Sequence, residues 1–328
     1  MKVSALAATN RLLERWIIVI LPVVLFAGFQ ASGALERYVP AVPFLFMYLT
    51  FVSSINVTKE QFAELRSKPW TIVILLALVH AATPWLSYGV LSVLYGRDNE
   101  LMLGALLAMI LPIGVTAIVW VTMSRGSTGI AIGMVTLDTL LSPLLLPLTL
   151  WLLLGTSVSI DAAGLIWGVV KLVVLPCLAG MLVGIWLRRK DRQTLRLSLG
   201  LSSKLTLYVI VLLNAAAMAA SITQLAGEVV KLVLTVGGLM VMGYALSWAA
   251  MRAMKLGSGA EIALTYSGGV RNYTAGIVIA QLYFTPQAAI PVMIAMLLQH
   301  PLALFVHFLF SRLKQAGTRS ASSASSTA

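Results

Sequence analysis

The stretch SGGVRNYTAG, residues 267–276, decides how this chain folds. Its flanks, IALTY before it and IVIAQLYF after it, are apolar, and together they are long enough to cross a bilayer. Gly268 and Gly269 loosen the backbone just before Arg271, which is a permanent cation. A charge within a membrane span is costly and usually faces a partner or a water-filled interior. The stretch therefore predicts an interrupted helix that carries a buried positive charge.

The composition places this stretch in a membrane protein. Of 328 residues, 59% are hydrophobic and only 10% are charged, whereas soluble domains carry about 25% charged residues. The net charge of +12 is spread over short connections between apolar spans, which argues against a nucleic-acid partner. The single cysteine, Cys177, rules out an intrachain disulfide and a cysteine metal cluster. We expect an all-α polytopic membrane protein without a cofactor or bound metal.

Ten apolar spans follow one another along the chain, and each reaches roughly the 20 residues that a transmembrane helix needs. Their expected limits are 16–34, 38–57, 70–95, 101–124, 128–154, 162–187, 203–222, 227–251, 259–284 and 287–311. The first span lacks a small-residue cleavage site, so we interpret it as a retained helix rather than a signal peptide. The last segment, AGTRSASSASSTA (residues 316–328), predicts a disordered tail.

The placement of the basic residues predicts how the chain lies in the membrane. With the N-terminus in the cytoplasm, eighteen of the 23 Lys and Arg residues fall in cytoplasmic segments. Two, Arg37 and Arg97, fall outside, and three, Lys171, Lys231 and Arg271, lie within spans. Because cytoplasmic loops carry an excess of Lys and Arg, we expect both termini to be cytoplasmic. The expected location is the cell (inner or plasma) membrane.

The span count also predicts the domain organisation. The extracellular segment GTSVSID, residues 155–161, has five spans before it and five after it. Because five is odd, the second half enters the membrane from the opposite side, which is the geometry of an inverted repeat. We expect a first five-helix repeat over residues 1–158, a second over residues 159–315 and the tail over residues 316–328.

A second interrupted span lies at the matching position of the first half. The fourth span contains LPIGVTAIVW, residues 111–120, in which Pro112 removes a backbone donor and Gly114 loosens the helix. The stretch at 267–276 lies in the fourth span of the second half. In transporters built from inverted repeats, interrupted helices at corresponding positions mark the binding site. A proline kink in one helix and close glycine packing in the other remain the structural alternative.

Two charges are expected at similar depth near the midplane. Counted along their helices, Arg271 lies about 16 Å and Asp138 about 15 Å from the cytoplasmic ends of their spans, at 1.5 Å per residue. The hydrocarbon core is roughly 30 Å thick. A pair between Asp138 and Arg271 is the simplest way to satisfy both charges. Such a pair could be functional or purely structural.

The chain resembles the bile acid:sodium symporter family, as a divergent, bacterial-type member. PIGVTA (112–117) and TLLSPLLLP (139–147) are similar to the fourth and fifth helices of that family, and GGVRNYTAGIVIA (268–280) to its ninth. The resemblance implies a core of spans three to five and eight to ten, and a panel of spans one, two, six and seven. It also implies that the interrupted fourth and ninth helices cross in the core, and that organic anions bind between core and panel with alternating access.

The sequence departs from that family at its sodium ligands. The glutamate of the ninth helix falls at Ser267, and the glutamine four residues later falls at Arg271. Five further polar positions of the family are replaced by Ala117, Ile118, Ala131, Val135 and Val79, the last with His80 beside it. Sodium needs several convergent oxygens, and these replacements remove most of the side-chain oxygens that the family supplies. Arg271 thus stands where the family would hold a metal cation.

The leading functional hypothesis is a secondary transporter that moves a small organic anion and is not coupled to sodium at the family's positions. For substrate binding we select Arg271, Asn272, Thr274, Thr116, Gly114 and His300. For coupling to an ion or proton we select Asp138, His80 and Ser267. No catalytic or metal-binding residue is assigned, and the expected partners are the anion and the lipid bilayer.

Three alternatives stay open. An ordinary sodium-coupled organic anion symporter would follow the family. A proton-coupled exporter like the arsenite-efflux carriers would lack their reactive cysteine in the fourth helix, because Cys177 lies in the sixth span. A membrane enzyme has little support, since the spans contain no H-E-x-x-H pair and no close carboxylate dyad. The residues do not identify the substrate, the direction of transport or the oligomeric state.

Overall fold

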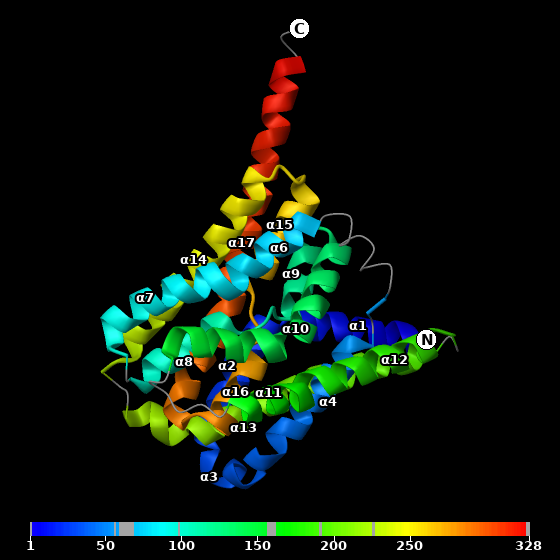
Figure 1. Ribbon diagram of the computed structural model, residues 1–328. Helices are drawn as coiled ribbons and strands as arrows, with labels where there is room; N and C mark the ends of the chain where they lie inside the picture. The colour runs from blue at the N-terminus through cyan, green and yellow to red at the C-terminus, as the bar shows by residue number, and fades with distance from the viewer. Residues whose placement is uncertain are drawn as a thin grey trace.

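The chain folds as a bundle of helices (Figure 1). A computed structural model describes residues 2–55, 57–58, 69–97, 99–155, 162–189, 192–224 and 227–325, and within these ranges the only β-structure is one isolated bridge. The first-half helices are α1 (Lys2–Arg15), α2 (Ile17–Gln30), α3 (Ser32–Leu35), the 3-10 helix η1 (Glu36–Ala41), α4 (Val42–Ser54), α6 (Pro69–Ala77), the π-helix η2 (Leu78–Ala82), α7 (Thr83–Tyr95), α8 (Glu100–Ile110), α9 (Thr116–Met123) and α10 (Thr128–Leu154).

The second-half helices are α11 (Ala162–Val169), the π-helix η3 (Val170–Val174), α12 (Leu175–Arg189), α13 (Gln193–Gln224), α14 (Val229–Ala253), α15 (Ser258–Gly269), α16 (Tyr273–Tyr283) and α17 (Pro286–Ser325). The prediction of an all-helical membrane protein is confirmed. Among the described residues, seven helical segments are long and apolar enough to cross a membrane, and three shorter apolar helices accompany them. Helices suit a bilayer because they satisfy their backbone hydrogen bonds internally.

The surface and the interior of the bundle are both apolar, as a lipid environment requires. Large hydrophobic side chains such as Trp70, Phe44 and Leu182 are exposed on the outside. Inside, one large cluster of buried residues includes Leu106, Leu150 and other aliphatic side chains. A second cluster, which includes Leu75 and residues of α9, α10 and α15, surrounds the helix interruptions described below.

The helices pack in two groups. The α4 group consists of α2, α4, α12 and α13 together with α1, and α13 packs along both α2 and α4. The α17 group consists of α6 to α10 and α14 to α17, in which α17 packs against α8, α14 and α16, and α14 lies along α15. In Figure 1, α4 and α12 run side by side at the lower right, while α14 and α6 occupy the upper part of the bundle. A site between the groups would therefore draw side chains from both.

The last helix differs from the sequence-based expectation. The helix α17 extends to Ser325 and projects beyond the bundle in Figure 1, so residues 316–325 are helical where the sequence predicts disorder. A helix that is already nucleated extends at little cost per residue. Residues 326–328 lie outside the described part of the chain. The division into repeats at 158 and 159, whose junction is also outside that part, stays a prediction.

Candidate functional site

Both predicted helix interruptions are present. The helix α8 ends at Ile110, just before Pro112, and α9 begins at Thr116. The helix α15 ends at Gly269, and α16 begins at Tyr273, where the Asn272 side chain caps it by accepting a hydrogen bond from the backbone N–H of Ala275 at 3.2 Å. The two interruptions leave backbone groups without helical partners, and such groups must be satisfied inside the protein.

The two interruptions satisfy each other. Ile113 and Arg271 form an isolated antiparallel β-bridge. The backbone N–H of Gly114 donates to the carbonyl of Val270 at 3.0 Å, and the N–H of Asn272 donates to the carbonyl of Pro112 at 2.8 Å. We call residues 111–115 and 270–272 the helix crossing. It places the N-termini of α9 and α16 next to each other.

Gly114 is required by the close approach of the two chains. A Cβ atom at this position would lie 2.5 Å from the carbonyl oxygen of Arg271, which is backbone and cannot easily move. We expect Gly114→Ala to lower the free energy of unfolding by about 1–3 kcal/mol, the usual cost of overpacking. Thermal unfolding in detergent measures this loss. The control is Gly89→Ala in α7, where nothing lies within 4 Å of the added atom; an equal loss there would contradict the explanation.

Gln299 of α17 connects both sides of the crossing. Its Oε1 accepts a hydrogen bond from the backbone N–H of Arg271 at 3.0 Å, and its Nε2 donates to Oγ1 of Thr116 at 3.2 Å. The side chain is buried. Sequence reasoning missed this residue because it searched the spans for charges. An amide in an otherwise apolar span, directly before the selected His300, was the available signal.

Among the described residues, Arg271 has no ion-pair partner. The residue is 3% exposed, and both terminal nitrogens, Nη1 and Nη2, lack a hydrogen-bond partner. Asp138 attracts the guanidinium at longer range but forms no hydrogen bond with it. The predicted Asp138–Arg271 pair is therefore wrong as a direct contact. Depth along a span gives the height of a side chain but not the direction in which it points around the helix.

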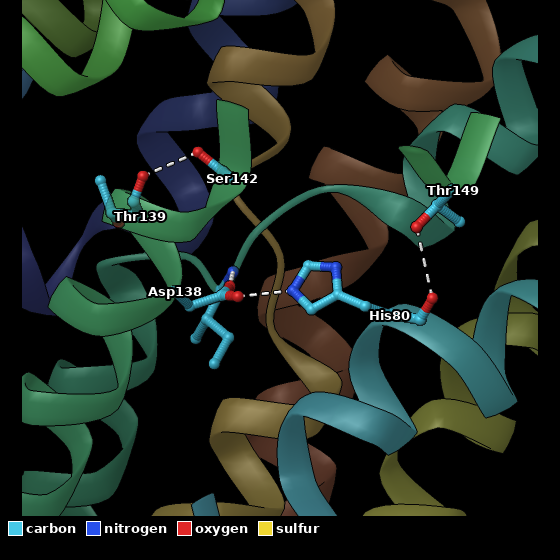
Figure 2. Close-up of polar contacts among 6 residues, drawn as sticks. His80, Asp138, Thr139, Ser142 and Thr149 are labelled. Carbon is cyan, nitrogen blue, oxygen red and sulfur yellow. Dashed lines mark hydrogen bonds and ion pairs between the residues drawn. The ribbon is translucent and has the colours of Figure 1, made fainter. Parts of the chain in front are cut away.

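Asp138 instead pairs with His80 (Figure 2). Oδ1 of Asp138 lies 2.5 Å from Nε2 of His80, and Oδ2 accepts a hydrogen bond from the backbone N–H of Ile113 at 2.5 Å. Asp138 is fully buried and His80 is 9% exposed. The Asp138 carboxylate thus fixes the interruption of the fourth span through the Ile113 N–H, and the backbone of Arg271 fixes the same residue through the β-bridge.

A cavity of about 400 Å³ opens beside the crossing, between the α4 group and the α17 group. All six residues selected for substrate binding line it: Gly114, Thr116, Arg271, Asn272, Thr274 and His300. From the α4 group the lining includes Thr50, Ser53, Ser203 and Lys204. Asp138, His80 and Ser267 do not line it. The structure thus separates the residues selected for substrate from those selected for coupling, and binding itself stays a prediction.

The positions of the family's sodium ligands lie in an apolar surrounding. Val79, Ala117, Ala131 and Val135 belong to the second buried hydrophobic cluster. The hydroxyl of Ser267 donates to the carbonyl of Ala263 in its own helix at 2.9 Å. Among the described residues, these positions therefore offer no set of side-chain oxygens that converge on one point.

A multi-pass helical membrane protein in which two interrupted helices meet beside a cavity and a buried arginine fits the class of membrane transporters. The model of the Sodium Bile acid symporter family matches residues 42–225, which is more than half of the chain, and the chain belongs to this family. The resemblance seen in the sequence is thereby confirmed.

The relatives are bacterial and plant proteins. The chain is 30% identical over 291 residues to "Uncharacterized protein YbaS" of Bacillus subtilis (strain 168), which covers 89% of this chain and 95% of the relative. It is 23% identical to "Uncharacterized sodium-dependent transporter YocS" of the same organism, over 74% of each chain. It is 25% identical to "Probable sodium/metabolite cotransporter BASS2, chloroplastic" of Oryza sativa subsp. japonica, over 74% of this chain and 57% of the relative.

Proposed function

We propose that this protein is a secondary transporter that moves a small organic anion by alternating access, without sodium at the positions that the family uses. The observation that carries this proposal is Arg271: a buried guanidinium with two unpaired terminal nitrogens lines the cavity between the two helix groups. A buried charge without a partner is strongly unfavourable. An anionic ligand in the cavity would supply the missing partner.

The surroundings of Arg271 suit a carboxylate or a similar anion. The N-termini of α9 and α16 meet at the crossing, and helix N-termini favour negative charge through their free N–H groups and their dipole. The planar guanidinium can donate to both oxygens of a carboxylate. Thr116 and Thr274 add hydroxyl groups to the same wall of the cavity. These features support an organic anion as the substrate.

The architecture supports alternating access. If α8 with α9, and α15 with α16, each form one interrupted span, the helices make the ten predicted crossings in two inverted halves. The α17 group then corresponds to the expected core and the α4 group to the expected panel. The cavity lies between them, so a movement of one group against the other would change the side from which it is reached. The charge distribution supports cytoplasmic termini in a cell membrane.

The same geometry argues against the family's sodium sites. A sodium ion 4 Å from the Arg271 guanidinium would be repelled by about 4 kcal/mol at an effective dielectric constant near 20. At 1.4 kcal/mol per tenfold, this corresponds to a loss of roughly 700-fold in affinity. Asp138 is not available as a sodium ligand, because His80 and the Ile113 N–H already occupy its oxygens. The ordinary sodium symporter, which the names of two relatives suggest for those proteins, is the second candidate.

Substitution of sodium tests this proposal. We expect uptake of an organic anion into proteoliposomes to continue when sodium is replaced by potassium or choline at constant membrane potential, with a rate within about twofold. The reason is that, in the described part of the chain, the side chains at the positions of the family's ligands supply no set of converging oxygens. A loss of most uptake in choline that millimolar sodium restores would contradict the proposal. That result would indicate that this protein is coupled to sodium and that backbone carbonyl oxygens form its sodium sites.

A further inference from the structure

We propose that the His80–Asp138 pair is the binding site of a coupled proton, and that the protein moves one proton together with each monovalent anion. This inference rests on the proposed function and names its coupling ion. The pair is buried at the helix crossing and outside the lining of the substrate cavity. It is therefore close enough to respond to the substrate but does not compete with it for space.

The position of the pair connects it mechanically to the substrate site. Asp138 Oδ2 accepts the hydrogen bond of the Ile113 N–H, and Ile113 is the residue that forms the β-bridge with Arg271. Protonation of the carboxylate would weaken this charge-assisted hydrogen bond. A change in the protonation of Asp138 thus acts on the backbone that positions the Arg271 guanidinium.

His80 is held in an unusual local structure. It lies in the π-helical turn η2, and its carbonyl accepts a hydrogen bond from Oγ1 of Thr149 at 3.3 Å, as Figure 2 shows. Single π-helical turns within α-helices occur frequently at functional sites. The turn rotates the His80 ring toward Asp138 of the neighbouring helix. A regular helix through residues 78–82 would offset the ring from this direction.

The hydrogen bonds indicate that this conformation is the proton-free one. Nδ1 of His80 is buried and has no hydrogen-bond partner. A neutral ring that donates through Nε2 to the carboxylate leaves only an unpaired acceptor at Nδ1. A protonated ring would leave an unpaired N–H donor there, and a buried donor without a partner is costly. Proton binding therefore belongs to a conformation in which water or an acceptor reaches Nδ1.

The charges at the crossing link the proton to the anion. With neutral histidines, Arg271 and Asp138 together give the helix crossing no net charge. Lys204 lines the cavity from α13 but is only partly buried, and its charge is present in all loading states. One bound monoanion leaves a net negative charge, one bound proton leaves a net positive charge, and both together restore neutrality. A net charge near the bilayer centre is costly. The empty and the fully loaded forms therefore change conformation more readily than either half-loaded form, which is the requirement for symport.

The coupling is reciprocal. Arg271 and Asp138 carry opposite charges at the same helix crossing and attract each other at longer range. An anion that neutralises Arg271 removes this attraction and raises the affinity of the pair for a proton. Thermodynamic linkage then requires that the proton raise the affinity for the anion by the same factor.

Other titratable groups lie on the elements that pack against η2 and α10. Glu100, Lys171, Lys231 and Arg252 are exposed, and Glu261 pairs with Arg252. Further groups on these elements are Tyr88, Tyr95, Tyr244 and Tyr266. The Tyr266 hydroxyl bonds to Ser124 and to the carbonyl of Ala303. Arg271 is the charged group that interacts electrostatically with Asp138, and it in turn interacts with Tyr244 and Tyr273.

Proteoliposomes that contain an entrapped pH-sensitive dye test the inference. The probe anions are pyruvate, gluconate and taurocholate, three monoanions of different size, each in radiolabelled form. We expect the anion that is transported to enter with one proton per molecule, at a rate that does not change with membrane potential. Reversing the direction of the pH gradient across the liposome membrane should reverse the direction of net anion movement.

Asp138→Asn separates coupling from binding. Asparagine is isosteric, and its Oδ1 still accepts from the Ile113 N–H. Its Nδ2 is a donor, so the hydrogen bond to His80 is kept only by the tautomer that accepts through Nε2. Its empty site carries the uncompensated charge of Arg271, whereas its anion-loaded site is neutral. Exchange of external for internal anion uses only the loaded form, while net uptake also needs the empty form. We expect the ratio of exchange to net uptake to rise about 100-fold, from the cost of one unpaired charge in the bilayer.

Matched variants complete the experiment. Glu228→Gln removes an exposed carboxylate paired with Lys231 and should leave the ratio unchanged. His80→Gln should shift the pH dependence of net uptake to lower pH, because the remaining carboxylate must bind the proton alone. Anion uptake without proton uptake, or an unchanged ratio in Asp138→Asn, overturns this inference and leaves the proposed function standing. Absence of transport of all three anions by the wild type overturns both.

Discussion

Replacement of Arg271 by glutamine is expected to abolish most anion uptake while the protein remains folded. The guanidinium is the buried cation of the cavity, and removal of one partner of a buried, hydrogen-bonded charge pair costs about 2–5 kcal/mol of binding. This corresponds to a loss of affinity of about 30-fold to several thousand-fold. Initial uptake rates into proteoliposomes, measured over a range of anion concentrations, give the change.

The stability of the same variant distinguishes a binding residue from a structural one. Both terminal nitrogens of Arg271 are unpaired in the empty protein, so glutamine removes no hydrogen bond of the guanidinium, and only its long-range attraction to Asp138 is lost. We expect Arg271→Gln to unfold within a few degrees of the wild type, because the loss of an unpaired buried cation and the loss of its attraction to Asp138 offset each other. An unfolding temperature far below that of the wild type would indicate that Arg271 stabilises the fold rather than binds the substrate.

Two further variants control this experiment. Arg271→Lys keeps the charge but loses the planar fork, so it should bind more weakly than the wild type and more strongly than Arg271→Gln. Arg252→Gln makes the same substitution at an exposed residue on the end of α14 and should change neither uptake nor stability appreciably. Full uptake by Arg271→Gln would contradict the proposed role.

The sequence was sufficient to predict the helical class and both helix interruptions. Hydropathy marks membrane helices reliably because lipid leaves the backbone few alternatives. Pro112 and the pair Gly268–Gly269 predicted both interruptions, and the ends of α8 and α15 agree with them. Conformational signals of this kind are local, and they can be read without knowledge of neighbouring helices.

The contacts between helices could not be read in the same way. Asp138 and Arg271 both contact Ile113 at the helix crossing, but the rotation of α10 directs the carboxylate to His80. Lys204 was counted with the cytoplasmic charges, yet it lines the cavity and donates to Oδ1 of Asn10 at 2.6 Å. Gln299 was missed because its partners come from two other helices. Each of these features depends on helix rotation and packing, for which a single sequence carries no direct signal.

The second large effect is expected at Gln299, whose replacement should lower the stability of the helix crossing. Leucine at this position has a similar volume but leaves the buried N–H of Arg271 and the hydroxyl of Thr116 without their partners. A buried polar group without a partner costs about 1–3 kcal/mol. We expect Gln299→Leu to lower the free energy of unfolding by about 2–4 kcal/mol, which a shift of the unfolding midpoint in detergent would report.

The matched control lies in α16. The amide nitrogen of Gln281 is buried and has no hydrogen-bond partner, so Gln281→Leu removes an unsatisfied group and should be neutral or stabilising. The two variants make the same chemical change and differ in the hydrogen bonds that are lost. Gln299→Leu should also reduce anion uptake more than its loss of stability explains, because Gln299 fixes the backbone from which the Arg271 guanidinium extends into the cavity. Equal stability of the two variants would show that the crossing is held by its backbone hydrogen bonds alone, and that Gln299 does not position Arg271.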